Sequence, residues 1–203
     1  MADVRRLMLA SGSRARRDML TAAGLQFDVL PADVDEDAIT AAMTSENDCV
    51  EAADIATALA AEKALSVARA NPDALVIGSD QVLARGRRMF SKAADIKEAR
   101  QTLTALRGRT HELVSAVALA SSNAVLWQSV GSAELTMRDF SDDFLDDYLA
   151  RNGARILGSV GCYEIEGAGI QLFERVDGDH FTIMGMPLLP LLAELRNLGV
   201  VRA

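Results

Sequence analysis

The chain has 203 residues and is acidic, with 29 Asp and Glu against 21 Lys and Arg and a net charge of −8. This balance argues against nucleic acid or an anionic membrane as the main partner, although a nucleotide needs only a local basic pocket. The sequence has no apolar run of 18 residues and no leader pattern, and its two cysteines lie far apart, so we expect a reducing, cytoplasmic location.

Hydrophobic patterning predicts strands and helices in alternation. The predicted strands cover residues 4–10, 26–30, 75–79, 113–120, 125–137, 159–165, 170–175 and 181–184. The predicted helices cover residues 14–23, 49–70, 95–106, 142–152 and 187–197. Helices separate the early strands, whereas the later strands follow one another as hairpins, which is typical of an α/β fold with a mixed sheet. No linker-like tract interrupts the chain, so we expect a single domain over residues 1–203, with two lobes that meet near Gly108.

Capping and turn residues mark several boundaries. Ser141 is suited to cap the helix that follows it, and Asp95 with Glu98 resembles a capping box. The Gly-Ala-Gly sequence at 167–169 lies between two predicted strands, and we expect it to form a hairpin turn or a bulge.

The segment at 7–20 is typical of a buried strand, a small-residue turn and the start of an arginine-rich helix. A helix start presents unpaired N–H groups and the positive end of the helix dipole, which together attract anions. Ser11 and Ser13 would add hydroxyl groups, and Arg16 and Arg17 would add planar charge that matches phosphate. The alternative is a capped surface helix with solvated arginines, and we expect Arg16 to be partly exposed.

Asp80 and Lys63 place charge where charge is costly. Asp80 follows the apolar run 75–77, and the carboxyl end of a buried strand is where open α/β sheets place ligands. The alternative is a turn aspartate that satisfies its own backbone. Lys63 falls on the apolar stripe of an alanine-rich helix, so it either meets an anion or extends its ammonium to water. If that stripe is packed, we expect Lys63→Met to be tolerated. Lys92, in a loop, would by default be a solvated surface lysine.

The stretch from residue 31 to residue 48 carries six acidic residues and no basic ones. A solvated loop is the ordinary interpretation of such a run. Asp35 and Glu36 directly follow the second predicted strand, so they are its members best placed to face a cleft. Carboxylates combined with substrate phosphates are the usual way in which proteins bind Mg²⁺.

Several common catalytic arrangements are missing from the sequence. It has neither a GxxxxGK phosphate loop nor a Gly-x-Ser-x-Gly elbow, and its two histidines are too scattered for a zinc site. Arginines, lysines and carboxylates without a nucleophile–histidine pair suit hydrolysis of a phosphoanhydride by an activated water.

The order of these segments resembles the Maf (septum formation inhibitor) family of nucleoside triphosphate pyrophosphatases. The resemblance runs from Leu7 to Gly199. Its elements are LASGS at 9–13 with two arginines at 16–17, VDE at 34–36, KA at 63–64, VIGSDQV at 76–82, Lys92, GRTH at 108–111, GCYEIEG at 161–167, FERVDGD at 173–179 and GMPL at 185–188. Each element is weak alone, and their common order makes the resemblance strong.

The resemblance implies an α/β fold with a mixed sheet in two lobes around a cleft, similar to inosine triphosphate pyrophosphatases. It implies cleavage of a nucleoside triphosphate to the monophosphate and pyrophosphate with a divalent cation, Mg²⁺ or Mn²⁺, and it is compatible with a homodimer. The residues that it implies for phosphate are Ser11, Ser13, Arg16, Arg17, Lys63 and Lys92. Asp80 would be the general base or a metal-positioning carboxylate, and Asp35 or Glu36 would complete the cation site.

Two features point to the branch of the family that acts on 7-methyl-GTP. These are the Gly-Ser-Asp-Gln sequence that ends at Gln81, and Glu166, where the dTTP/UTP branch carries glutamine. A carboxylate can accept from both N1–H and the exocyclic amine of guanine, and methylation at N7 adds a positive charge. The chain departs from the family at Ala15 and Ala93, where arginine and proline are usual. A dTTP/UTP pyrophosphatase, a phosphatase that releases orthophosphate and a non-catalytic nucleotide-binding regulator of cell division are the alternatives.

Overall fold

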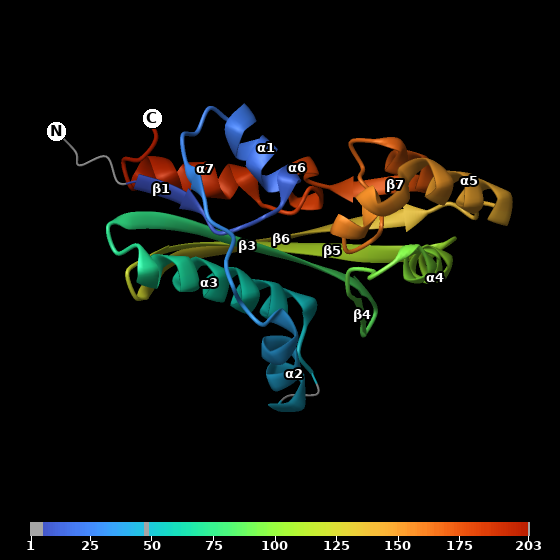
Figure 1. Ribbon diagram of the computed structural model, residues 1–203, viewed down its shortest axis with the longest axis horizontal. Helices are drawn as coiled ribbons and strands as arrows, with labels where there is room; N and C mark the ends of the chain where they lie inside the picture. The colour runs from blue at the N-terminus through green and yellow to red at the C-terminus, as the bar shows by residue number, and fades with distance from the viewer. Residues whose placement is uncertain (1–5, 47–48, 203) are drawn as a thin grey trace.

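The computed structural model describes residues 6–46 and 49–202, and one mixed sheet runs through them (Figure 1). Its strands are β1 (Arg6–Leu9), β2 (Asp28–Val29), β3 (Ala74–Arg85), β4 (Arg88–Phe90), β5 (Thr110–Ser121), β6 (Ala124–Met137) and β7 (Phe173–Gly178). The strand order is β2-β1-β3-β5-β6-β7, with β4 paired to β3. β1 is parallel to β2 and β3, and the other pairs are antiparallel, which confirms the predicted mixed sheet.

Helices cover both faces of this sheet (Figure 1). They are α1 (Arg14–Ala22), α2 (Glu36–Glu46), α3 (Ala52–Ala70), α4 (Ile96–Leu106), α5 (Asp142–Asn152), α6 (His180–Ile183) and α7 (Leu188–Asn197), with 3-10 helices η1 (Gly153–Gly158) and η2 (Ala168–Leu172). One core lies between α3 and the sheet, and a second lies between the sheet and the pair α1 and α7. A third core gathers α4, α5 and the far ends of β5 and β6. No helix in the described part of the chain is both long and apolar enough to cross a membrane.

Gly78 allows α3 to lie very close to β3. A Cβ atom at this position would lie under 3.0 Å from the backbone of Ala60 and Ala64, so a larger residue would push the helix away from the strand. The alanine-rich face of α3 serves the same close approach, because its small side chains are fully buried against the sheet. This contact brings Lys63 of α3 next to the middle of β3.

Several predicted boundaries agree with the structure. Ser141 accepts a hydrogen bond from the Phe144 amide at the start of α5. Asp95 accepts one from the Glu98 amide, while the Glu98 side chain accepts one from Ala94. The cap by Asp95 is therefore confirmed, but the full capping box is not, because Glu98 accepts from Ala94, the residue before the N-cap, and not from the Asp95 amide.

Other predicted elements are wrong. Residues 36–46 of the acidic run form α2, because Ile39 and Met43 pack against the core under α3. Residues 159–165 form no strand, since the chain turns at Gly161 and Cys162 has a positive φ of 57°. Residues 181–184 belong to a helical turn, α6, which Asp179 caps by accepting from an amide.

The remaining differences are shifts of boundary. The helix predicted from residue 49 begins at Ala52, and the strand predicted from residue 170 begins at Phe173. The Gly-Ala-Gly sequence at 167–169 leads into η2 and not into a hairpin. Residues 4 and 5 of the first predicted strand lie outside the described residues.

Candidate active site

A gap in the pairing of β3 opens the candidate site. β1 pairs with β3 only as far as Ile77, and β4 pairs with it only from Leu83 onward, so residues 78–82 meet neither strand on that edge. A cleft of about 1090 Å³ opens there. Asp80 was predicted at the end of a strand, whereas the structure places it inside β3, just beyond the end of the parallel pairing. The prediction of a strand ending at residue 79 is wrong, but Asp80 still faces the cleft.

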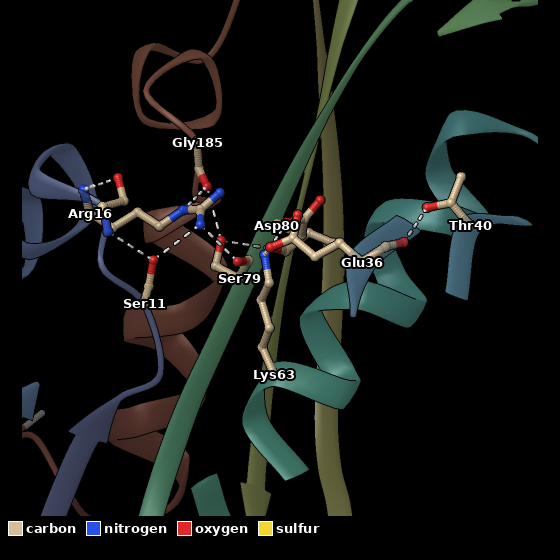
Figure 2. A network of polar contacts seen from close by, with 10 residues as sticks. Ser11, Arg16, Glu36, Thr40, Lys63, Ser79, Asp80 and Gly185 are labelled. Atoms are coloured by element: carbon tan, nitrogen blue, oxygen red, sulfur yellow. Dashed lines mark hydrogen bonds and ion pairs between the residues drawn. The ribbon is translucent and has the colours of Figure 1, made fainter. Parts of the chain in front are cut away.

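Lys63 joins two carboxylates at the base of the cleft (Figure 2). Its Nζ lies 2.5 Å from Oδ1 of Asp80 and 2.6 Å from Oε1 of Glu36. The side chains of Lys63 and Asp80 are only 10% and 9% exposed, while that of Glu36 is 45% exposed. The ammonium on the apolar stripe of α3 thus meets anions and does not extend to bulk water.

The cations of the cleft act on the titration of Glu36. Burial by itself would raise the pKa of this carboxyl group, but the hydrogen bond and charge of Lys63 outweigh it, with smaller contributions from Lys92 and Arg16. The net pKa of Glu36 therefore lies below its ordinary value. Glu36 is an anion at neutral pH, held beside cations that would otherwise face substrate phosphates.

Arg16 is buried, contrary to the expectation of partial exposure. Its Nη1 donates to the carbonyl oxygen of Ser79 at 2.8 Å and to Oγ of Ser11 at 3.2 Å, and its Nε donates to the carbonyl oxygen of Gly185 at 2.9 Å. These contacts tie α1 to β3 and to the turn after α6 (Figure 2). Burial lowers the pKa of the Arg16 guanidinium, and the charges of Asp80 and Glu36 oppose that shift.

Gln81 lies on the face of β3 opposite Asp80, because neighbouring residues of a strand point to opposite sides. Its Nε2 donates to Oγ of Ser115 at 2.9 Å and to the carbonyl oxygens of Thr182 and Ile183 at 3.2 and 3.0 Å. The amide nitrogen of Gln81 therefore anchors α6 to the sheet, although the residue also lines the cleft.

The structure brings most of the other predicted residues to the same cleft. Ser11, Ser13, Lys92 and Glu166 all line it, and Ser13 also caps α1 by accepting from the Arg16 amide.

Arg17 and Asp35 do not line the cleft. The Arg17 guanidinium lies against Asp18, and Asp35 accepts from the Ala38 amide at the start of α2. Within residues 6–46 and 49–202, no three His, Cys, Asp or Glu side chains gather closely enough to hold a metal ion by themselves.

Three further residues that line the cleft were not singled out from the sequence. Tyr163 is buried, and Arg155 of η1 forms an ion pair with Glu164. The only sequence signal for Tyr163 and Glu164 was the GCYEIEG motif at 161–167, most of which the hydrophobic pattern wrongly assigned to a strand.

The fold and the site define an α/β protein whose cleft places lysine and arginine side chains beside paired carboxylates, an arrangement suited to polyphosphate chemistry. The family model for Maf-like proteins matches residues 6–198, and the chain belongs to that family.

Relatives match the chain over almost its whole length. A protein of Mesorhizobium japonicum named 7-methyl-GTP pyrophosphatase is 50% identical over 97% of this chain and 98% of its own. A Granulibacter bethesdensis protein named nucleoside triphosphate pyrophosphatase is 51% identical, covering 95% and 96%. A second 7-methyl-GTP pyrophosphatase, from Rhizobium etli, is 48% identical over 97% and 98%.

Proposed function

We propose that this protein is an enzyme that hydrolyses a nucleoside triphosphate to the monophosphate and pyrophosphate, with 7-methyl-GTP as its preferred substrate. The observation that carries the proposal is the buried ammonium of Lys63 between Asp80 and Glu36, at the base of a cleft that also holds Ser11 and Lys92. The names of relatives about 50% identical along nearly the full chain support the same activity.

The reaction adds water to the α-phosphorus and breaks its bond to the bridging oxygen, so that pyrophosphate leaves. In this proposal Asp80 accepts the proton of the attacking water. Lys63 and Lys92 neutralise the charge that develops on the leaving pyrophosphate. The hydroxyl of Ser11 and the start of α1 hold phosphate oxygens, because helix N-termini favour anions.

The carboxylates of the cleft also fit a divalent cation. Glu36 and Asp80 share one ammonium, so their oxygens lie close together, and Mg²⁺ or Mn²⁺ is commonly held by one or two carboxylates plus substrate phosphates. A bound cation would supply further neutralisation of phosphate charge. Asp35 does not fit this role, because its side chain caps α2.

Product analysis and one substitution test the proposal. The protein is incubated with 7-methyl-GTP, GTP, dTTP and UTP in the presence of Mg²⁺ or Mn²⁺, and pyrophosphate and orthophosphate are measured separately. Pyrophosphate release, with the highest kcat/KM for 7-methyl-GTP, is expected.

Asp80→Asn keeps the shape of the side chain and removes its basicity, and we expect it to lower kcat by about 10²–10⁴. Orthophosphate as the product would contradict the reaction, and a folded Asp80→Asn variant with more than about a tenth of wild-type turnover would contradict the role of Asp80. The cytoplasmic location remains a prediction from the sequence, and the homodimer remains an expectation from the family resemblance.

A further inference from the structure

The segment at 159–166, between η1 and η2, forms one wall of the cleft. It lies toward the α5 end of the sheet (Figure 1). Its cleft-lining members are Ser159, Val160, Tyr163, Glu164, Ile165 and Glu166, and Arg155 of η1 lines the cleft beside them. No residue of the segment has a role in the phosphate chemistry proposed above, so the wall is available to contact another part of a nucleotide.

Close packing holds this wall in one conformation. The Tyr163 side chain is buried, and its hydroxyl lies 2.8 Å from Nε2 of His111, which is itself buried in β5. A Cβ atom on Gly161 would lie under 3.0 Å from the Tyr163 ring, and one on Gly169 would lie as close to the backbone of Glu164. Glycine is required at both positions for these contacts, and together they fix the backbone of Glu164.

Glu164 is better placed than Glu166 to act through charge. The Glu164 side chain is only 29% exposed and forms an ion pair with Arg155. Glu166 is exposed, and it lies in a turn closed by a hydrogen bond from the Gly167 amide to the Glu164 carbonyl oxygen. Solvent and salt weaken the field of an exposed carboxylate, whereas a partly buried one acts more strongly on a nearby charge.

The ion pair leaves Glu164 with capacity to bind more. Nη2 of Arg155 contacts Oε2 of Glu164, while an ionised carboxylate offers two oxygens and about four lone-pair sites. A guanine edge presents two adjacent N–H donors to such a group, and methylation at N7 makes the ring cationic. The positive charge of Arg155 opposes that cation, so the two members of the ion pair act on it with opposite sign.

We propose that Glu164 is the specificity-determining carboxylate of the cleft, that it recognises a cationic, N7-methylated guanine, and that Arg155 limits this preference. The inference deepens the function proposed above and rests on it. It transfers to Glu164 the role that the sequence alone predicts for Glu166.

The test compares Glu164→Gln, Glu166→Gln and Arg155→Gln in the full-length protein. The quantity measured is the ratio of kcat/KM for 7-methyl-GTP to that for GTP, because these substrates differ only in the methyl group and its charge. We expect Glu164→Gln to lower the ratio about tenfold or more, as for a lost charge-assisted contact, and Glu166→Gln to change it less than about threefold. Arg155→Gln should raise the ratio, and an unchanged ratio would contradict the limiting role of Arg155.

A merely structural ion pair would respond differently, because Glu164→Gln and Arg155→Gln would then lower stability and the ratio together. That result, or a larger effect of Glu166→Gln than of Glu164→Gln, overturns the inference. Binding of the nucleosides 7-methylguanosine and guanosine, measured by calorimetry, separates the inference from the proposed reaction. If the wild-type protein releases no pyrophosphate, the proposed reaction is wrong. The inference about Glu164 is tested separately by nucleoside binding: it is overturned if Glu164→Gln has the same preference for 7-methylguanosine over guanosine as the wild type.

Discussion

Replacing Lys63 by methionine removes the only cation that directly contacts both Asp80 and Glu36 among the ion pairs of the described residues. The apolar stripe around Lys63 favours tolerance of methionine, but the contacts in the structure reverse that expectation. Asp80 is 9% exposed and would lose its partner, and removal of one member of a buried ion pair costs about 3–5 kcal/mol. Glu36 is 45% exposed, so water compensates for most of its own loss.

Burial of the methionine side chain offsets part of this cost, by about 1 kcal/mol. The expected loss in the free energy of unfolding is therefore about 2–4 kcal/mol. Urea unfolding followed by circular dichroism measures it, with Lys97→Met on the exposed face of α4 as the matched control. The control should change stability by less than about 0.5 kcal/mol.

A double variant decides whether the cost comes from the unpaired charge. Lys63→Met combined with Asp80→Asn removes the buried carboxylate as well, so it should be more stable than Lys63→Met alone by at least about 1 kcal/mol. If Lys63→Met unfolds at the same urea concentration as the wild type, or if the double variant is no more stable than the single one, then the reasoning from burial is refuted.

Two further predictions concern buried cations and imidazole. Arg16→Lys loses the guanidinium bonds to two backbone carbonyl oxygens, which should lower the free energy of unfolding by about 2–4 kcal/mol and slow turnover. Arg17→Lys, at an exposed position, should do neither. Equal melting temperatures for the two variants would contradict this prediction. Burial lowers the pKa of His111 from 6.5 to about 4. The unfolded chain therefore binds this proton more tightly than the folded protein does. The contribution of His111 to the free energy of unfolding is complete above pH 6.5 and falls by about 3 kcal/mol in all as the pH drops toward 4. His111→Asn should flatten the melting-temperature profile over that range and Tyr163→Phe should not; parallel profiles for His111→Asn and the wild type would show that the imidazole does not titrate as burial requires.

Local sequence signals were sufficient for the elements whose ends depend on neighbouring residues. Ser141 and Asp95 cap the helices that follow them because a side-chain oxygen and an amide three residues later meet in any such turn. The strand–turn–helix at 7–20 likewise needs only its apolar run and its small residues. The same patterns identified Lys63 and Asp80, since a charge within an apolar run stands out without knowledge of the fold.

Elements decided by contacts between distant segments were not predictable in this way. The apolar content of residues 159–165 suits a strand, but the Tyr163 ring lies over Gly161 and reaches His111, 52 residues earlier, which forces a turn. Charge in the run 31–48 suggests a loop, but two apolar side chains that pack under α3 make residues 36–46 a helix. Burial of Arg16 is of the same kind, because one of its acceptors lies 169 residues away, at Gly185.

The register of the sheet explains why a carboxylate within a strand can serve a cleft. Asp80 pairs with Ala116 of β5 on one side of β3, which fixes its backbone in the centre of the fold. On the other side β1 has ended and β4 has not begun, so this edge of β3 is open at residues 78–82. A side chain on a rigid central strand is held more precisely than one on a loop, and precise placement is what general-base chemistry requires. Exposure of Asp80 to substrate therefore arises from the short length of β1, and α3 supplies Lys63 to the same opening only because Gly78 has no side chain.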